Sequence, residues 1–355
     1  MAASSSRADD FGPLTDQGSG WQLLSLAPVP IERVLAWFEG IAGLGVSVPA
    51  ERTPAGVRAA IGAADIVISD WSGALRVDSA EIAVARRLAF LMSAGVGLDN
   101  LDLDALTGAG VVVANTAGLT AQSVAEWCFG AAFAVARSLA WVDGRVRSGD
   151  WPQFELPERG STEIAGLRVG VVGFGAVGSR VAALFGAIGC EVAYSTRRRR
   201  SAVDEGGATW MRLADLAARS DVLVVNVSLA PETRGLVDAA VLAELPRGAI
   251  VVDASRGGIV DHLALLGAVE TGSLRGAAID VFEREPLRAD SPLRRSDRIL
   301  LSSHAAATTG QAMARIFALV TDNVRRAVAG EPIRSVVNGL GPVVVRRERT
   351  APQTG

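Results

Sequence analysis

A glycine-rich turn between an apolar run and a helical pattern constrains this chain more than any other stretch. Residues 167–172 form a short, valine-rich run that is typical of a buried parallel strand. The turn after it has the pattern G-x-G-x-x-G, at Gly173, Gly175 and Gly178, and apolar residues then recur at helical spacing as far as Phe185. The first glycine allows a tight turn, the second a close approach of phosphate, and the third close packing of helix on strand. This order predicts a dinucleotide-binding unit, with the phosphates on the N–H groups that open the helix.

Apolar runs alternate with helical patterns along most of the chain. Runs near residues 21–26, 64–69 and 88–93 are separated by helical segments, and five further runs follow the glycine turn. Alternation with short connections indicates layered α/β units with mostly parallel sheets. We expect two doubly wound parallel-sheet domains, one Rossmann-like and one flavodoxin-like, with a cleft between them.

The composition excludes several classes of protein. With 49% hydrophobic residues and a net charge of −3, the chain offers no overall basic field for nucleic acid or acidic membranes. No apolar run is long enough to span a bilayer and the N-terminus lacks a signal core, so we expect a cytoplasmic protein. The two cysteines, Cys128 and Cys190, lie far apart in apolar surroundings. They are expected to be core residues, with no metal site and no disulfide framework.

Missing residue types narrow the acid–base chemistry. The chain has no lysine, one tyrosine and two histidines, His262 and His304. A Schiff base, a P-loop lysine and a Tyr-x-x-x-Lys dyad are therefore excluded, and proton transfer near neutral pH falls to histidine or a tuned carboxylate. His262 follows Asp261 at the start of a predicted helix and is expected at the surface.

A basic turn ends the second predicted strand of the dinucleotide unit. It reads Thr196-Arg-Arg-Arg-Arg200, and the first carboxylate after it is Asp204. A carboxylate here would bind the ribose 2′-OH, whereas arginine pairs bidentately with a 2′-phosphate. We therefore expect NADP to be preferred over NAD. A solvated basic turn is the alternative interpretation.

Three side chains with useful chemistry follow predicted strands at the edge where ligands bind. Arg256 follows one strand, Glu285 follows the next, and His304 follows the last. Each alone is more often structural, but a cation, an acid and a histidine at equivalent sheet positions form a candidate catalytic constellation.

Between about residues 94 and 338 the chain resembles the D-isomer-specific 2-hydroxyacid dehydrogenase family, which includes glyoxylate/hydroxypyruvate reductases and phosphoglycerate dehydrogenases. Residues 21–93 fit the family only in general pattern. The motifs, in order, are Gly-Val-Gly-Leu-Asp-Asn from Gly95, Asn115-Thr-Ala-Gly with Val124-Ala-Glu126, the glycine turn, Leu229-Ala-Pro-Glu-Thr-Arg-Gly235, Ser255-Arg-Gly-Gly-Ile-Val, Asp280-Val-Phe-Glu-Arg-Glu-Pro-Leu and Ser303-His-Ala-Ala-Ala-Thr308.

The resemblance implies roles for the candidate catalytic and substrate-binding residues. Arg256 would bind the carboxylate and carbonyl of a 2-keto acid, and His304 would be the acid/base. Glu285 would orient His304 and favour its charged form. The backbone N–H groups of Val96 and Gly97 would cradle the substrate carboxylate.

For the cofactor, the resemblance implies that Asp280 hydrogen-bonds the nicotinamide carboxamide. Hydride would pass from NADPH to the 2-keto carbon while His304 protonates the alkoxide, in a cleft that closes to exclude water. The expected cofactor-binding residues are Gly173, Gly175, Ala176, Val177, Gly178, Thr196, Arg197, Arg198, Ala254 and Asp280.

Some positions depart from the family pattern. Ala176 stands where the family often has arginine, Ala117 replaces a usual proline, and Asn226-Val-Ser228 replaces His-x-Pro. These changes concern cofactor affinity more than chemistry. Val96 stands where phosphite dehydrogenases carry lysine, and no regulatory domain follows Asn338, so phosphite oxidation and a feedback-controlled phosphoglycerate dehydrogenase are both disfavoured.

The sequence of 355 residues is expected to form two domains and two terminal segments. We expect a dinucleotide domain at residues 119–305 and a discontinuous substrate domain at residues 21–118 and 306–340. Residues 1–20 are expected to be disordered and residues 341–355 to form a polar tail.

The function expected is an NADP-preferring reductase of small 2-keto acids such as glyoxylate or hydroxypyruvate. By analogy with the family it would be a homodimer, with the helix that carries Glu126 as a contact. Trp71, in a loop after a predicted strand, is expected to line the pocket, a core tryptophan being the alternative. Two other functions stay open: a dinucleotide-sensing module like the corepressors that share this fold, and a biosynthetic dehydrogenase for a bulkier acid.

Overall fold

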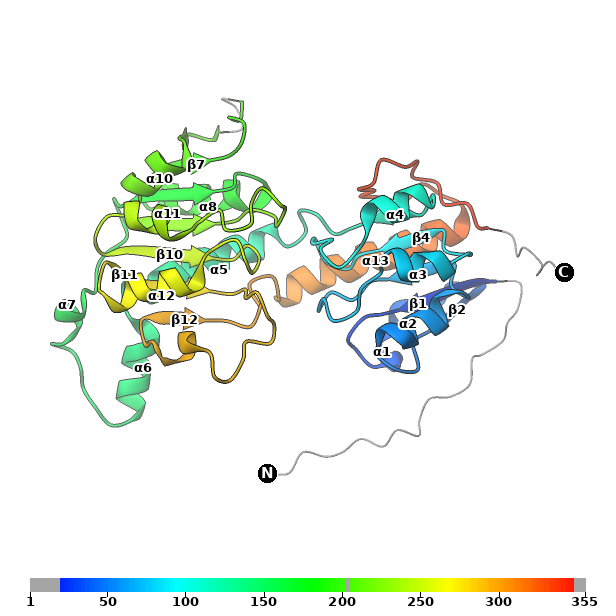
Figure 1. Cartoon of the computed structure of the whole chain (residues 1–355), viewed down its shortest axis with the longest axis horizontal. Helices are drawn as coiled ribbons and strands as arrows, with labels where there is room; N and C mark the ends of the chain where they lie inside the picture. The colour runs from blue at the N-terminus through cyan, green and yellow to red at the C-terminus, as the bar shows by residue number, and fades with distance from the viewer. Residues whose placement is uncertain (1–19, 202–204, 348–355) are drawn as a thin grey trace. The chain divides into compact units, whose positions relative to one another are not determined.

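The computed structural model describes residues 20–201 and 205–347 (Figure 1). The predicted N-terminal tail as far as residue 19, the end of the predicted polar tail from residue 348 and the carboxylate of Asp204 lie outside the described residues.

The chain divides into two compact units, each an α/β unit on one parallel sheet, as predicted. Unit 1 is formed by Met1–Leu119 and Met313–Gly355, and unit 2 by Thr120–Ala312. The cleft expected from the sequence stays a prediction.

Unit 1 is built on a five-stranded sheet with the order β2-β1-β3-β4-β5, in which every pair is parallel. This is the strand order of flavodoxin-like folds. The strands are β1 (Trp21–Ser25), β2 (Leu44–Ser47), β3 (Ile66–Ile68), β4 (Phe90–Met92) and β5 (Val112–Ala114), and the helices are α1 (Ile31–Trp37), α2 (Pro54–Ile61), α3 (Ser79–Val84), α4 (Leu103–Gly108) and α13 (Gly310–Ala329).

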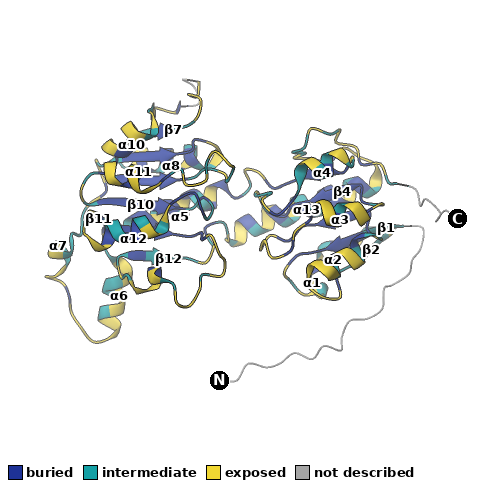
Figure 2. Ribbon diagram, in the orientation of Figure 1, coloured by how far each residue is buried: buried dark blue, intermediate teal, exposed yellow. Residues whose placement is uncertain are grey.

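Both faces of this sheet are buried, so its strands read as apolar runs (Figure 2). Successive residues of a strand point to opposite faces. Leu23 therefore packs in the core shared with Ile316 and Val320 of α13, whereas Leu24 packs in the core shared with Val57 of α2.

Unit 2 is built on a seven-stranded parallel sheet with the order β12-β11-β10-β9-β6-β7-β8. The order is that of a Rossmann fold with one strand added at the edge. The strands are β6 (Arg168–Val172), β7 (Glu191–Ser195), β8 (Thr209–Trp210), β9 (Val222–Val225), β10 (Ala249–Asp253), β11 (Leu274–Ile279) and β12 (Ile299–Leu301), and the α-helices are α5 (Ala121–Ala136), α6 (Leu139–Arg147), α7 (Leu156–Arg159), α8 (Ala176–Ala187), α10 (Leu213–Arg219), α11 (Ala239–Glu244) and α12 (His262–Glu270).

Helices cover both faces of this sheet as well. Val181 of α8 and Ala132 of α5 share one core with Val171 of the central strand β6. On the other face, Leu216 of α10 and Leu265 of α12 pack in a second core. The two layers leave the strand ends as the places where ligands can reach backbone and loop side chains.

Three short elements were missed in the sequence. The edge strand β8 has two residues, α7 has a single turn, and α6 follows α5 with no apolar stripe of its own, since none of its residues is buried. Elements of two to four residues are too short to show a periodic pattern, and a helix with no buried face has no apolar stripe that the sequence could reveal.

The start of the predicted polar tail packs on unit 1. Val344 is buried in the α13 core, and Nε of Arg346 lies 3.5 Å from Oδ1 of Asp65. Residues 343–347 read Val-Val-Val-Arg-Arg, and Val344 turns into the core while Val343 and Val345 stay exposed and Arg346 reaches the buried carboxylate.

Both cysteines are free and buried, which confirms the prediction that they are core residues. Burial raises the pKa of the Cys128 thiol far above its ordinary value. Among the described residues, no helix is long and apolar enough to cross a membrane, and no three potential metal ligands gather.

Asp65 provides a test of the unit 1 fold. Its fully buried carboxylate accepts from Nε and Nη2 of Arg87, at 3.2 and 2.8 Å, and from the N–H of Gln22 at 2.8 Å. Asp65→Ala should lower the free energy of unfolding by about 3–5 kcal/mol, because it leaves the Arg87 guanidinium half-buried without its carboxylate. Denaturant unfolding followed by tryptophan fluorescence measures the change. Glu39→Ala, at an exposed site of the same unit, is the control and should cost less than about 0.5 kcal/mol; equal losses would contradict the assignment.

Candidate active site

The glycine turn lies where the strand order of unit 2 reverses. β6 and β9 are neighbours in the sheet although two strands separate them in the chain, and such a switch point is where doubly wound sheets bind ligands. Gly173 has φ +92°, and a Cβ on it would lie 2.5 Å from the carbonyl oxygen of Asn226. A Cβ on Gly178 would lie 2.0 Å from the carbonyl oxygen of Gly173. Neither position therefore accepts another residue.

The space beside the turn suits a dinucleotide. A Cβ on Gly175, the N-cap of α8, would have no neighbour within 4 Å, so the backbone there is open to a ligand. The N–H groups of Ala176 and Val177 open α8 at this point, where the helix dipole favours phosphate. The side-chain Nδ2 of Asn226 is buried beside the turn without an acceptor among the described residues. An unmet buried donor next to an open phosphate cradle fits a cofactor rich in oxygen acceptors.

The basic turn after β7 is fixed by hydrogen bonds of Tyr194, the one tyrosine in the sequence. Tyr194 is fully buried, and its hydroxyl donates to Oε1 of Glu205 at 3.0 Å and accepts from the N–H of Arg200 at 2.9 Å. Arg199 pairs with the same carboxylate through Nε at 2.7 Å and Nη2 at 3.1 Å, which holds the pKa of Glu205 below its ordinary value.

The four arginines of this turn are therefore not equivalent. Arg199 is neutralised by Glu205, whereas the guanidinium groups of Arg197 and Arg198 are exposed and meet no partner in the described part of the chain. Thr196 bonds to the carbonyl oxygen of Arg198 at 2.7 Å, which gives the turn a defined shape. The turn thus presents two uncommitted cations beside the end of β7.

The loop after β10 carries the candidate cation, Arg256, and the residues whose contacts fix its position. Asp253 ends β10 and is fully buried, and its Oδ1 accepts from the N–H of Ser255 at 3.1 Å. Nη1 of Arg256 donates to the carbonyl oxygen of Ser255 at 2.8 Å. Ala254, an expected cofactor contact, is half-buried between them. These contacts fix the loop from which Arg256 extends.

The candidate acid and base meet after β11 and β12. Oε2 of Glu285 lies 2.8 Å from Nδ1 of His304, and its Oε1 accepts from the N–H of Phe282 at 2.9 Å. Nε2, the other ring nitrogen of His304, has no partner within the described residues and is the atom left for a ligand. His304 has φ +56°, a left-handed conformation that is costly for a residue with a side chain.

Asp280 holds this strained turn. Its buried carboxylate accepts from the N–H groups of Ala305 and Ala306, at 2.8 and 2.9 Å, and its own carbonyl oxygen accepts from the N–H of His304 at 2.8 Å. Asp280 therefore orients the backbone on both sides of His304. Its expected bond to the nicotinamide stays a prediction.

The charge state of Glu285 follows from its contacts. Burial raises the pKa of Glu285, but the bonds from His304 and the Phe282 N–H, with the charges of His304 and Arg256, outweigh it and leave the pKa below its ordinary value. The three predicted catalytic residues thus follow three adjacent strands, β10, β11 and β12, at one edge of the sheet.

The prediction that His262 lies at the surface is wrong. Its side chain is only 10% exposed, and Nε2 lies 2.9 Å from Oδ2 of Asp253. His262 is the first residue of α12 and turns back towards the sheet, while Leu263 is the 67% exposed neighbour. The sequence at a helix start shows no periodicity, so it could not indicate which of the two faces inward.

Unit 1 carries the remaining predicted residues. The N–H groups of Val96 and Gly97 find no acceptor within the described residues, as a backbone cradle for an anion requires. Trp71 is 39% exposed and lies against Trp37 and Phe317, with ring centroids 6.1 and 6.2 Å away. It is thus partly exposed rather than enclosed in the core.

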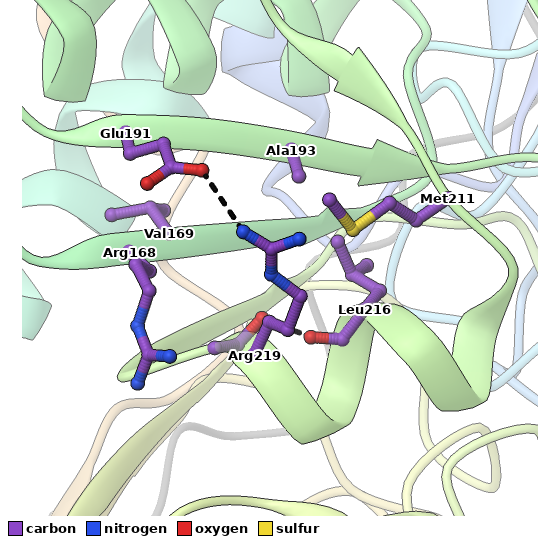
Figure 3. Close-up of a pocket in the computed structure, with 8 residues that line it drawn as sticks. Arg168, Val169, Glu191, Ala193, Met211, Leu216 and Arg219 are labelled. Carbon is purple, nitrogen blue, oxygen red and sulfur yellow. Dashed lines mark hydrogen bonds and ion pairs between the residues drawn. The ribbon is translucent and has the colours of Figure 1, made fainter.

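A recess elsewhere in unit 2 is not this site (Figure 3). It is lined in part by Arg168 and Glu191, the first residues of β6 and β7, and by Arg219, which pairs with Glu191 at 3.4 Å. It therefore lies at the amino ends of the strands, opposite the edge where a dinucleotide binds.

Comparison with known proteins gives one family. A model of the D-isomer specific 2-hydroxyacid dehydrogenase, NAD binding domain, matches residues 129–306. D-3-phosphoglycerate dehydrogenase of Mycobacterium leprae is 39% identical over 79% of this chain, but the chain spans only 52% of that protein. Glyoxylate reductase of Aeropyrum pernix is 34% identical over 74% of this chain and 80% of its own length.

The solved structures agree. An NADPH-dependent glyoxylate/hydroxypyruvate reductase of Sinorhizobium meliloti, in complex with NADP and malonate, is 25% identical with a TM-score of 0.81. The match covers 93% of this chain and 100% of that one.

The lowered pKa of Glu285 predicts how its contribution to stability depends on pH. A lowered folded-state pKa stabilises the protein above the ordinary pKa of glutamate, about 4.3, and this contribution is lost as the pH falls through the lowered value. Glu285→Gln should therefore be less stable than the wild type at pH 7, and the two should converge below about pH 4. Urea unfolding from pH 3 to 8 measures this, with Glu270→Gln at an exposed helix end as the control. A difference that stays constant with pH would contradict the assigned ionisation.

Proposed function

Because the chain belongs to the D-isomer specific 2-hydroxyacid dehydrogenase family, we propose that it reduces a small 2-keto acid to the D-2-hydroxy acid with NADPH. The proposal rests mainly on the 2.8 Å contact between Oε2 of Glu285 and Nδ1 of His304. Arg256 follows β10, the strand next to β11, which Glu285 follows. A carboxylate-held histidine beside a cation is what proton transfer to a developing alkoxide needs.

The residues divide the reaction between them. A reduced nicotinamide cofactor, held by the glycine turn, would supply the hydride for the carbonyl carbon. Nε2 of His304 gives the proton to the carbonyl oxygen, and Glu285 stabilises the charged imidazole before the transfer. Arg256 binds the substrate carboxylate and lowers the energy of negative charge on the oxygen. The carbonyl thus gains one hydride and one proton and becomes a hydroxyl group.

The preference for NADPH rests on the basic turn. Arg197 and Arg198 are exposed and pair with no carboxylate within residues 20–201 and 205–347, while Tyr194 and Glu205 fix the turn that presents them. Two guanidinium groups at the end of the second strand of a Rossmann unit suit a 2′-phosphate. The S. meliloti relative, which is NADPH-dependent, supports the same choice.

The substrate we propose is unphosphorylated, of the glyoxylate or hydroxypyruvate type. In unit 1 the unmet N–H groups of Val96 and Gly97 can hold a carboxylate, and the exposed face of Trp71 is apolar. Arg52, beside the same strand ends, is committed to Asp70 at 2.9 Å and to two backbone carbonyls. A phosphoglycerate substrate would need a cation to bind its phosphate, and Arg52 is already paired and not available for this.

We also propose a homodimer and a cytoplasmic location. Glu126 is exposed on α5, and Trp151 and Phe154 are 77% and 82% exposed in the same unit. Large exposed aromatic side chains support an interface with a second copy. A dinucleotide-sensing module remains the alternative function, and turnover distinguishes it from an enzyme.

Initial rates of NADPH and NADH oxidation test the proposed function. The panel is glyoxylate, hydroxypyruvate, pyruvate, phenylpyruvate and phosphohydroxypyruvate. We expect turnover of the unphosphorylated acids, faster with NADPH than with NADH. Tight dinucleotide binding without turnover of any acid would contradict the reductase and favour the sensing module. Selective turnover of phosphohydroxypyruvate would overturn the substrate proposal alone.

The cofactor preference has its own test. Arg197→Ala with Arg198→Ala should raise the KM for NADPH at least about tenfold, since each charge-assisted contact contributes about 1.5–3 kcal/mol. The KM for NADH should change less than about threefold, because NADH has no 2′-phosphate. Arg247→Ala is the matched control, as this exposed arginine lies at the amino end of β10. Equal increases for both cofactors would contradict a 2′-phosphate site.

A further inference from the structure

His262, the histidine outside the candidate catalytic set, lies between the loop that carries Arg256 and the loop that carries Glu285. Nε2 of His262 lies 2.9 Å from Oδ2 of Asp253, at the start of the Arg256 loop. Its ring makes an edge-type contact with the ring of Phe282 in the Glu285 loop, with centroids 6.0 Å apart and planes at 65°. One buried side chain therefore contacts both loops.

On the Arg256 side, the contact continues to the backbone next to the arginine. Asp253 is fully buried, and while Oδ2 meets His262, Oδ1 accepts from both the N–H and the hydroxyl of Ser255. The carbonyl oxygen of Ser255 in turn accepts from the Arg256 guanidinium at 2.8 Å. Loss of the His262 contact would leave a buried carboxylate oxygen without its partner, and such a group is costly enough to shift the loop.

On the other side, the contact continues to the acid–base pair. Phe282 is buried, and its N–H donates to Oε1 of Glu285 at 2.9 Å, while Oε2 of Glu285 holds His304. The ring of Phe282 is thus placed by His262, and its backbone places the carboxylate that orients the base.

The two loops are also in direct backbone contact. A Cβ on Gly257 would lie 2.1 Å from the carbonyl carbon and oxygen of Phe282, so no side chain fits between them. Gly257 follows Arg256 in the chain, and Glu283 follows Phe282. A shift of either loop would therefore move the other, and His262 contacts both next to this junction.

We propose that His262 is a positioning residue that locks the Arg256 loop to the Glu285 loop and so fixes the cation relative to the acid–base pair. Its catalytic meaning rests on the proposed function, but the locking itself is a property of unit 2. Histidine suits this place because one ring nitrogen pairs with a buried carboxylate while the ring also packs against an aromatic side chain. His262 contacts no substrate here; it acts through Asp253 and Phe282.

The test uses two replacements of His262 and a neighbour as control. His262→Leu removes the bond to Asp253 and keeps an apolar side chain, whereas His262→Gln places an amide nitrogen near the position of Nε2. His262→Leu should lower kcat/KM for the 2-keto acid about 10- to 100-fold, since small displacements of catalytic groups have effects of this order. His262→Gln should recover most of the loss. Leu263→Gln, at the exposed position beside it, should leave kcat/KM unchanged.

Two further readouts separate positioning from a general structural role. The Kd for NADPH of His262→Leu, measured by tryptophan fluorescence, should rise by a much smaller factor than kcat/KM falls, because the glycine turn that would hold the phosphates is on other strands and only Ala254 and Asp280 of the expected cofactor contacts lie in the two loops. Asp253→Asn combined with His262→Leu should cost no more than the larger single change, since the two residues act as one unit.

Hydrogen exchange tests the lock without reference to turnover. In His262→Leu, peptides covering residues 253–259 and 280–286 should exchange faster together, while the glycine turn at residues 173–178 should not change. If the wild type turns over no acid, the proposed function fails and this measurement still decides the inference. An unchanged kcat/KM in His262→Leu, or faster exchange in only one of the two loops, would overturn the proposed lock.

Discussion

The buried carboxylate of Asp280 is the interaction on which the site depends. It accepts from the N–H groups of Ala305 and Ala306, and the carbonyl oxygen of the same residue accepts from the N–H of His304. These three bonds stabilise the left-handed backbone of His304, which its side chain would otherwise disfavour. The position of the imidazole, and hence its bond to Glu285, therefore follows from a residue one strand away.

The same logic extends along the sheet. Parallel strands end at one edge, so loops that are far apart in the chain become neighbours there. β10, β11 and β12 bring Arg256, Glu285 and His304 to adjacent strand ends, and the switch between β6 and β9 places the glycine turn at the same edge. Buried carboxylates hold three of the loops of unit 2: Asp253 holds the loop of Arg256, Asp280 the turn of His304, and Glu205 the basic turn after β7.

The sequence predicts the parts of this arrangement that have a strong local signal. The parallel two-domain fold, the glycine turn and the buried cysteines follow from the apolar runs, the glycine spacing and the apolar surroundings of the cysteines. The inward turn of His262 does not follow, because it depends on where α12 meets the sheet. Nor does the inequality of the four arginines, since the partner of Arg199 is Glu205, which no pattern singles out. Contacts between loops depend on packing that local periodicity does not encode.

In the proposed reduction His304 transfers the proton, while the other residues of the site bind the substrate and cofactor and orient His304. The most direct measurement is the single-turnover rate of NADPH oxidation by His304→Asn with saturating 2-keto acid, together with the Kd for NADPH. If His304 is the proton donor, the rate should be lower by about 10²- to 10⁴-fold with cofactor affinity nearly unchanged, because only general acid catalysis is lost. A variant that keeps the wild-type rate would contradict the claim, and another group would then have to supply the proton.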